Sequence, residues 1–307
     1  MAKALLVSLP GAVELGLIYA IMALGVYITF RVLDFPDLTV DGSFTTGAGI
    51  ASILIIGGTA PWLASIAAFF GGVAAGACTG LLHTKGKVNG LLSGILMMIA
   101  LYSINMHIMG KPNLSLRGSE TIFTDVSPLV IMPVIVLMIK LLLDWLLHTD
   151  LGLALRATGD NPRMIRSFGA NTDMNKILGI SLSNGLVALS GALIAQQSGF
   201  ADISMGIGMI VIGLASVIIG EAIFGAGTVV RATLAVIFGS IIYRFVVALA
   251  LQVKWFNASD LKVITALIVI VALVVPTVQR HFKQRKVAQV RSHELLAAKD
   301  TRMDGES

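Results

Sequence analysis

The chain has 307 residues, of which 56% are hydrophobic and 13% charged, and its mean hydropathy is +0.89. Soluble globular proteins carry roughly twice this fraction of charged residues. The composition therefore excludes a soluble enzyme or binding domain and predicts an all-α, polytopic integral membrane protein. The net charge of +5 does not indicate nucleic-acid binding, because in a membrane protein the position of the positive charges matters more than their sum.

Nine hydrophobic segments are expected to form transmembrane or re-entrant helices. They are Pro10–Phe30, Leu38–Ile56, Pro61–Leu82, Val88–Ile108, Pro128–Leu147, Ile177–Gln196, Met205–Phe224, Val229–Leu251 and Leu261–Val278. The second segment begins with polar residues, and the seventh is rich in glycine and ends at Glu221. Either one could be broken or re-entrant, as is common where a transport path is lined. Residues 1–279 are expected to form one membrane domain, followed by a basic tail, 280–307.

The third segment carries Gly72, Gly76 and Gly80 at a spacing of four residues. This spacing places the three glycines on one face of a helix and predicts the close approach of another helix.

A polar stretch, Arg156–Lys176, interrupts the apolar pattern and carries its own helix signals. Asn161 is a good N-cap, Pro162 takes the first helical position, and Gly169 follows the last turn. Three interpretations of this stretch are possible: a folded loop, a helix lying on lipid headgroups, or a helix that docks on a cytoplasmic protein. With this stretch inside, 15 of the Lys and Arg residues fall inside and five outside. That bias predicts an outside N-terminus and a cytoplasmic C-terminus.

Some polar residues fall within or near the apolar segments. Because charge in the bilayer is costly, Asp41 and Glu221 are candidates for a path or gate, and a buried structural hydrogen bond is the alternative. Ser43 and Asn184 are neutral candidates for the same role. Glu14 and Asp144 lie near segment ends, where they can snorkel to the interface.

Signatures of catalysis are absent from the sequence: there is no HExxH, CxxC or GxGxxG. The nearest approach to a phosphate-binding loop has the wrong spacing, and Val88 stands where Ser or Thr would bind magnesium. The five histidines are scattered. No enzyme activity, cofactor or metal is expected, and ATP hydrolysis by this chain alone is excluded.

Long runs of the sequence resemble the permease subunits of bacterial ABC importers of the branched-chain amino acid and ribose class. The strongest is LRATGDNPRMIRSFGANTDMNKILGISLSNGLVALSGALIAQ at Leu155–Gln196, and YAIMALGVYITFRVLDFPDLTVDGSFTTGA at Tyr19–Ala48 resembles the N-terminal region of that class. Met109–Leu116 and Gly199–Glu221 resemble a narrower subgroup, which pairs with tryptophan- or tyrosine-type solute-binding lipoproteins. The similarity runs from about residue 10 to residue 278.

The resemblance implies an importer in the bacterial cytoplasmic (inner) membrane for a small solute such as an amino acid. It implies a solute-binding protein outside, an ATP-binding cassette subunit inside, and a second permease, identical or related. The polar stretch would be the coupling helix. Its shape would depend on Asp160, Asn161, Pro162 and Gly169, and its contacts with the ATPase on Arg163, Met164, Arg166 and Phe168. The alternative is a secondary transporter driven by an ion gradient, with Asp41 and Glu221 as its ion sites.

Overall fold

The structure is a computed structural model that describes residues 2–251, 263, 266–267, 270 and 274. Within that part, seven helices are long and apolar enough to cross a membrane. They are formed by α1 (Ala2–Tyr27) with the π-helical turn η1 (Ile28–Val32), α2 (Thr39–Ile56), α3 (Pro61–Thr84), α4 (Gly90–Met109), α5 (Pro128–His148), α8 (Thr172–Ser198) and α10 (Val229–Leu251). The predicted all-α membrane fold is confirmed. The ninth predicted segment, Leu261–Val278, and the tail 280–307 lie outside the described residues, apart from isolated positions in the segment.

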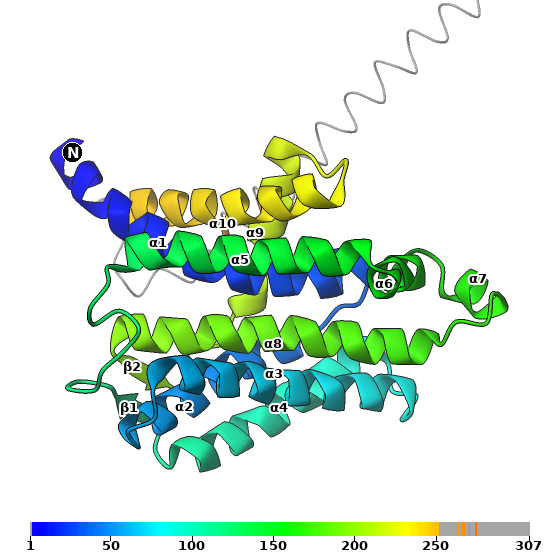
Figure 1. The fold of residues 1–307 in the computed structure, drawn as a ribbon, viewed down its shortest axis with the longest axis horizontal. Helices are drawn as coiled ribbons and strands as arrows, with labels where there is room; N and C mark the ends of the chain where they lie inside the picture. The colour runs from blue at the N-terminus through cyan, green and yellow to red at the C-terminus, as the bar shows by residue number, and fades with distance from the viewer. Residues whose placement is uncertain (1, 252–262, 264–265, 268–269, 271–273, 275–307) are drawn as a thin grey trace, which may run out of the picture.

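The short elements gather at the two ends of the bundle (Figure 1). β1 (Asn113–Ser115) pairs antiparallel with β2 (Phe200–Asp202) at the same end as the start of α1. At the opposite end, α6 (Asp150–Asp160) and α7 (Pro162–Ser167) join α5 to α8. Because most long helices run between these ends, the two short-element regions mark opposite faces of the membrane.

Local sequence explains where several helices begin and end. The side chains of Asn89 and Ser127 cap α4 and α5 by accepting a hydrogen bond from a backbone N–H in the first turn. At the other end, Gly110 and Gly199 adopt left-handed backbone conformations and terminate α4 and α8. The segment boundaries predicted from hydropathy therefore coincide with physical start and stop signals.

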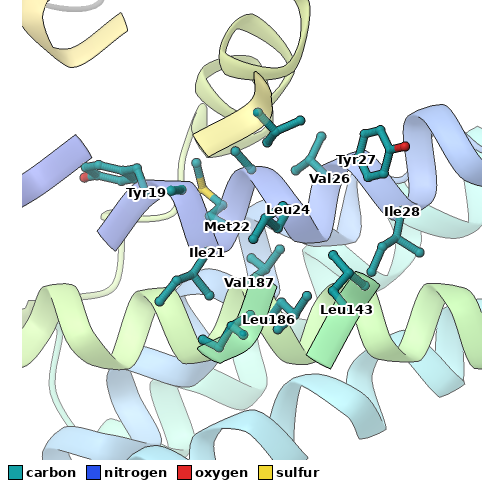
Figure 2. Close-up of a cluster of buried hydrophobic side chains, with 14 of the residues drawn as sticks. Tyr19, Ile21, Met22, Leu24, Val26, Tyr27, Ile28, Leu143, Leu186 and Val187 are labelled. Carbon is teal, nitrogen blue, oxygen red and sulfur yellow. The ribbon is translucent and has the colours of Figure 1, made fainter. Parts of the chain in front are cut away.

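The helix α1 is central in the core and packs against α8, α10, α9 and α5. Figure 2 shows side chains on several faces of α1, among them Ile21, Met22 and Leu24, with Leu186 and Val187 of α8 close by. These three α1 side chains are fully buried. A helix that is apolar on every face can be surrounded by protein or by lipid, and the burial of these side chains shows that protein surrounds this part of α1.

The predicted close helix approach occurs between α3 and α8. A Cβ atom added to Gly72 would lie 2.3 Å from the Asn184 carbonyl oxygen, and one added to Gly76 would lie 2.5 Å from that of Ile180. Neither distance is compatible with a real side chain. The glycine face of α3 therefore allows the two backbones to approach closely, which aligns α8 with α3 along much of its length.

Asp144 does not snorkel to the interface, as its position near a segment end had suggested. Its side chain is buried in α5 and forms an ion pair with Lys140 one turn earlier. Thr233 of α10 also donates a hydrogen bond to Asp144 Oδ1 at 2.7 Å. The sequence-based expectation was wrong because α10 covers this face of α5 and supplies a polar partner.

Candidate functional site

The seventh predicted segment is not a full spanning helix. After β2, residues 203–208 form a run of turns, and α9 (Met209–Phe224) begins only at Met209. Its N-cap, Gly208, has a φ of +88°, which an L side chain rarely adopts. The interpretation of this segment as interrupted agrees with the structure, whereas α2, the other candidate for interruption, is continuous from Thr39 to Ile56.

Asp41 of α2 caps the start of α9. Its Oδ2 accepts a hydrogen bond from Gly208 N and its Oδ1 one from Ile210 N, both at 2.8 Å. The residue next to it, Gly42, contacts Leu101 near the middle of α4, so the cap lies well inside the bilayer. A carboxylate is well suited to this place, because the free N–H groups and the dipole of a helix N-terminus favour negative charge.

Asp41 also lines a cavity of about 610 Å³ between α2, α4 and the start of α9. Its wall extends from Leu38, at the N-cap of α2, to Ile203, directly after β2. The described lining is Leu38, Asp41, Gly42, Thr45, Met98, Ile99, Tyr102, Ser103, Asn105, Ile203, Ile207, Gly208, Ile210 and Val211. The cavity is thus largely apolar, with a few polar groups and one carboxylate.

Ser43 and Asn184 belong to a different, closed arrangement. Ser43 Oγ donates to Asn184 Oδ1 at 2.7 Å, and Asn184 Nδ2 donates to Asp37 Oδ2 at 2.6 Å. Asp37 Oδ1 in turn accepts from Thr39 N at 2.9 Å, and all four residues are buried. This network ties the start of α2 to the middle of α8. Neither Ser43 nor Asn184 lines the cavity at Asp41.

Asp37, in the connection between η1 and α2, is a structural residue. Its bond to the backbone of Thr39, two residues later, is the pattern expected of an aspartate that starts a turn. That local signal could have been found in the sequence. The bond to Asn184, 147 residues away, could not.

Glu221, near the end of α9, pairs with Arg31 of η1 at 2.9 Å. The Arg31 side chain is 49% exposed, whereas that of Glu221 is 12% exposed. We expect Glu221→Gln to lower the free energy of unfolding by at most about 1 kcal/mol, because solvent screens a half-exposed ion pair. Thermal unfolding of the purified protein and solute uptake would measure this. A tenfold loss of uptake at unchanged stability would instead assign Glu221 to ion transfer.

The helix signals in the polar stretch are confirmed. The Asn161 side chain accepts a hydrogen bond from Met164 N, Pro162 is the first residue of α7, and Gly169 has a φ of +85°. Asp160 is the last residue of α6. The stretch therefore comprises the end of α6, the separate helix α7 and the first turn of α8.

The side chains in and next to α7 have two roles: Met164 and Phe168 are exposed, and Arg166 ties the helix to α8. Met164 is 53% exposed and Phe168, directly after the helix, is 74% exposed, while Arg163 is exposed beside them. Arg166 instead points back toward α8, where its guanidinium donates to Thr172 Oγ1 at 2.7 Å and pairs with Asp173 at 2.8 Å. These two contacts of Arg166 hold α7 against α8 and leave Met164 and Phe168 uncovered. The helix α7 itself lies at the end of the bundle (Figure 1).

Comparison with known proteins identifies the family to which this chain belongs. The sequence model of the family described as "Branched-chain amino acid transport system / permease component" matches residues 11–274. The chain belongs to this permease family. It is therefore a multi-pass membrane permease subunit of an ABC importer of the branched-chain amino acid and ribose class, as its sequence runs had suggested, and it forms the path for a small solute.

Named relatives agree with this assignment. The permease is 46% identical over 258 residues to a tyrosine transport system permease protein of Clostridioides difficile, covering 84% of this chain and 87% of that protein. It is 32% identical over 181 residues to the Escherichia coli ribose import permease protein RbsC, covering 56% of each chain. Among solved structures, PsaBC from Streptococcus pneumoniae in complex with Fab has a similar fold, with a TM-score of 0.56 at 14% identity over 93% of the permease and all of that chain.

Proposed function

We propose that the permease carries an amino acid across the bacterial inner membrane in a complex with a second permease, two ATP-binding subunits and an extracytoplasmic solute-binding protein. The amino-acid class rests on the relative whose printed name is a tyrosine transport permease, which matches most of both chains. ATP binding and hydrolysis take place on the separate subunits and switch the path between outward and inward access.

The observation that carries this proposal is the construction of α7. A six-residue helix with its own N-cap, first-turn proline and terminal glycine stands out from the end of the bundle. Met164 and Phe168 project from it, although exposed aromatic and methionine side chains are typical of protein interfaces rather than of a solvated loop. We assign these two side chains, with Arg163, to a groove on the ATPase, and Arg166 to holding the helix in place.

Loss of the two apolar side chains should uncouple the complex. We expect Met164→Ala combined with Phe168→Ala to reduce solute-stimulated ATPase activity and uptake by tenfold or more, because docking surfaces depend on a few large apolar side chains. Both activities would be measured in proteoliposomes, and co-purification would report ATPase binding. Leu153→Ala on α6, which removes a similarly exposed apolar side chain from the same end of the bundle, is the matched control. Wild-type coupling in the double variant would overturn this assignment.

The opposite end of the bundle suits the solute-binding protein. There the β1–β2 pair presents Asn113 and Asp202 side by side, joined by a hydrogen bond of 3.3 Å. Hydrogen bonds from Ser204 hold the pKa of the Asp202 carboxyl below its ordinary value, so this end keeps a fixed negative charge. With α7 in the cytoplasm, the N-terminus and these strands are extracytoplasmic, and the C-terminal tail, 280–307, is cytoplasmic.

The cavity at Asp41 is the part of the path that the described residues form. It lies between the two ends of the bundle and joins the start of α2 to the residues after β2. In this assignment Asp41 orders the broken segment that borders the path, and the Arg31–Glu221 pair holds the end of α9 against η1 on the cytoplasmic side. Ser43 and Asn184 support the path indirectly by fixing α2 on α8.

A further inference from the structure

Asn105 of α4 has an incomplete set of hydrogen bonds. Its side chain is 1% exposed and lines the cavity at Asp41. Nδ2 donates to the Gly42 carbonyl oxygen at 3.2 Å, whereas Oδ1 is buried without a partner. An unpaired buried acceptor costs about 1–3 kcal/mol. This oxygen therefore favours any hydrogen-bond donor that can reach it from the cavity that Asn105 lines.

The charge of the cavity points to the kind of donor. Asp41 supplies a carboxylate, and the described lining contains no Lys, Arg or His. Each Asp41 oxygen already accepts one backbone N–H, which leaves a second lone-pair direction on each. The positive end of α9 offsets part of the negative charge. A solute carboxylate would meet acceptors and like charge here, whereas an ammonium group would meet acceptors and opposite charge.

The rest of the cavity lining is suited to the apolar part of a bound solute. Met98, Ile99, Ile207 and Val211 form much of the wall, and Tyr102 adds an aromatic ring. A volume of about 610 Å³ is in the range of pockets that hold small molecules. The chemistry that fits is one ammonium group attached to an aliphatic or aromatic side chain.

We propose that the solute's ammonium group is held in this cavity by Asn105 Oδ1 and the Asp41 carboxylate, with its side chain against the apolar wall. The inference rests on the proposed function, because it gives the permease a selective site within the path. Asn105 is then a specificity-determining residue that distinguishes amines and amino acids from solutes without an amine.

The single cysteine of the chain allows a direct test. In a Cys78→Ser background, Ser103→Cys places one thiol in the cavity lining. The rate of modification by a methanethiosulfonate reagent would be measured on the permease–ATPase complex in proteoliposomes. L-tyrosine and tyramine, which carry the amine, should slow the modification, whereas 3-(4-hydroxyphenyl)propionate, which lacks it, should not. Equal protection by all three compounds, or protection by Na⁺ alone, would overturn the inference.

Substitution of Asn105 completes the test. Asn105→Leu should raise the concentration of tyramine needed for protection about tenfold or more, the effect of losing one hydrogen bond to a charged group. Asn105→Asp loses the hydrogen bond from Nδ2 to the Gly42 carbonyl oxygen but retains an acceptor, so it should preserve protection better than Asn105→Leu. If Asn105→Leu does not assemble, the smaller Asn105→Ala takes its place. An unchanged protecting concentration in these variants would contradict the role of Asn105.

A separate measurement distinguishes the two proposals. ATP-driven uptake of tyrosine and of leucine would be followed in the unaltered complex with its binding protein. If neither is transported, the amino-acid function itself fails. If transport occurs but protection does not depend on the amine or on Asn105, the function stands and the site inference fails.

Discussion

Replacing Asp41 by Ala is expected to abolish uptake and to destabilise the start of α9. The substitution leaves Gly208 N and Ile210 N without their acceptor in the middle of the membrane. An unsatisfied buried N–H costs about 1–3 kcal/mol, so the loss of these two part-buried bonds should lower the free energy of unfolding by about 2–6 kcal/mol. Thermal unfolding of the complex in mild detergent would report the stability, and uptake in proteoliposomes the transport.

Two further variants make the result specific. Asp41→Asn retains one carbonyl acceptor, so its stability should lie between those of the wild type and Asp41→Ala. Thr45→Val, one turn further along the same face of α2, removes a hydroxyl whose bond to the Asp41 carbonyl oxygen is long, at 3.4 Å, and should change little. If Asp41→Ala unfolded at the wild-type temperature and transported normally, the capping role would be wrong.

The second large effect is expected at Asp144. Its replacement by Ala leaves the Lys140 ammonium group buried without its ionic partner, between α5 and α10. Breaking a buried ion pair from one side typically costs about 3–5 kcal/mol. We therefore expect Asp144→Ala to lose most of the folded complex, which would be measured as the monodisperse fraction in size-exclusion chromatography and as a lowered melting temperature.

The double variant Lys140→Met with Asp144→Leu is the control for this prediction. It removes both charges and fills the space with apolar side chains, a change that is often neutral for a buried pair. It should recover most of the lost stability, at the expense of the hydrogen bond from Thr233. A double variant as unstable as Asp144→Ala would show that the carboxylate has a role beyond neutralising Lys140.

Much of the fold follows from local properties of the sequence. Runs of about 20 apolar residues predicted the spanning helices, because a bilayer requires each one to satisfy its backbone internally. The α7 signals, from Asn161 to Gly169, acted within a few residues of each other, and the structure has the helix they predicted. The spacing of Gly72, Gly76 and Gly80 predicted a close contact with another helix but did not identify that helix.

Less of the candidate site could be predicted from the local sequence. Asp41 and Glu221 stood out as charges in apolar segments, but their partners lie 167 and 190 residues away along the chain. Asn105 gave no signal, since a buried asparagine in a spanning helix usually has hydrogen-bond partners on its own or a neighbouring helix. Ser43 and Asn184 were placed with Asp41 from their polarity, although they face a different, closed network.

By itself, then, the sequence determined that this is a polytopic helical permease with a capped helix between two spans. These properties depend on hydropathy, on capping and on spacings within one or two helical turns. The tertiary structure decided which polar groups are satisfied and which remain available. Asp37, Asp144 and Asn184 are closed off by partners from other helices, whereas Asp41 and Asn105 meet at a cavity because α4 and the broken start of α9 approach the same face of α2. The availability of a polar side chain depends on what packs against it, and that is fixed by long-range contacts rather than by its neighbours in the chain.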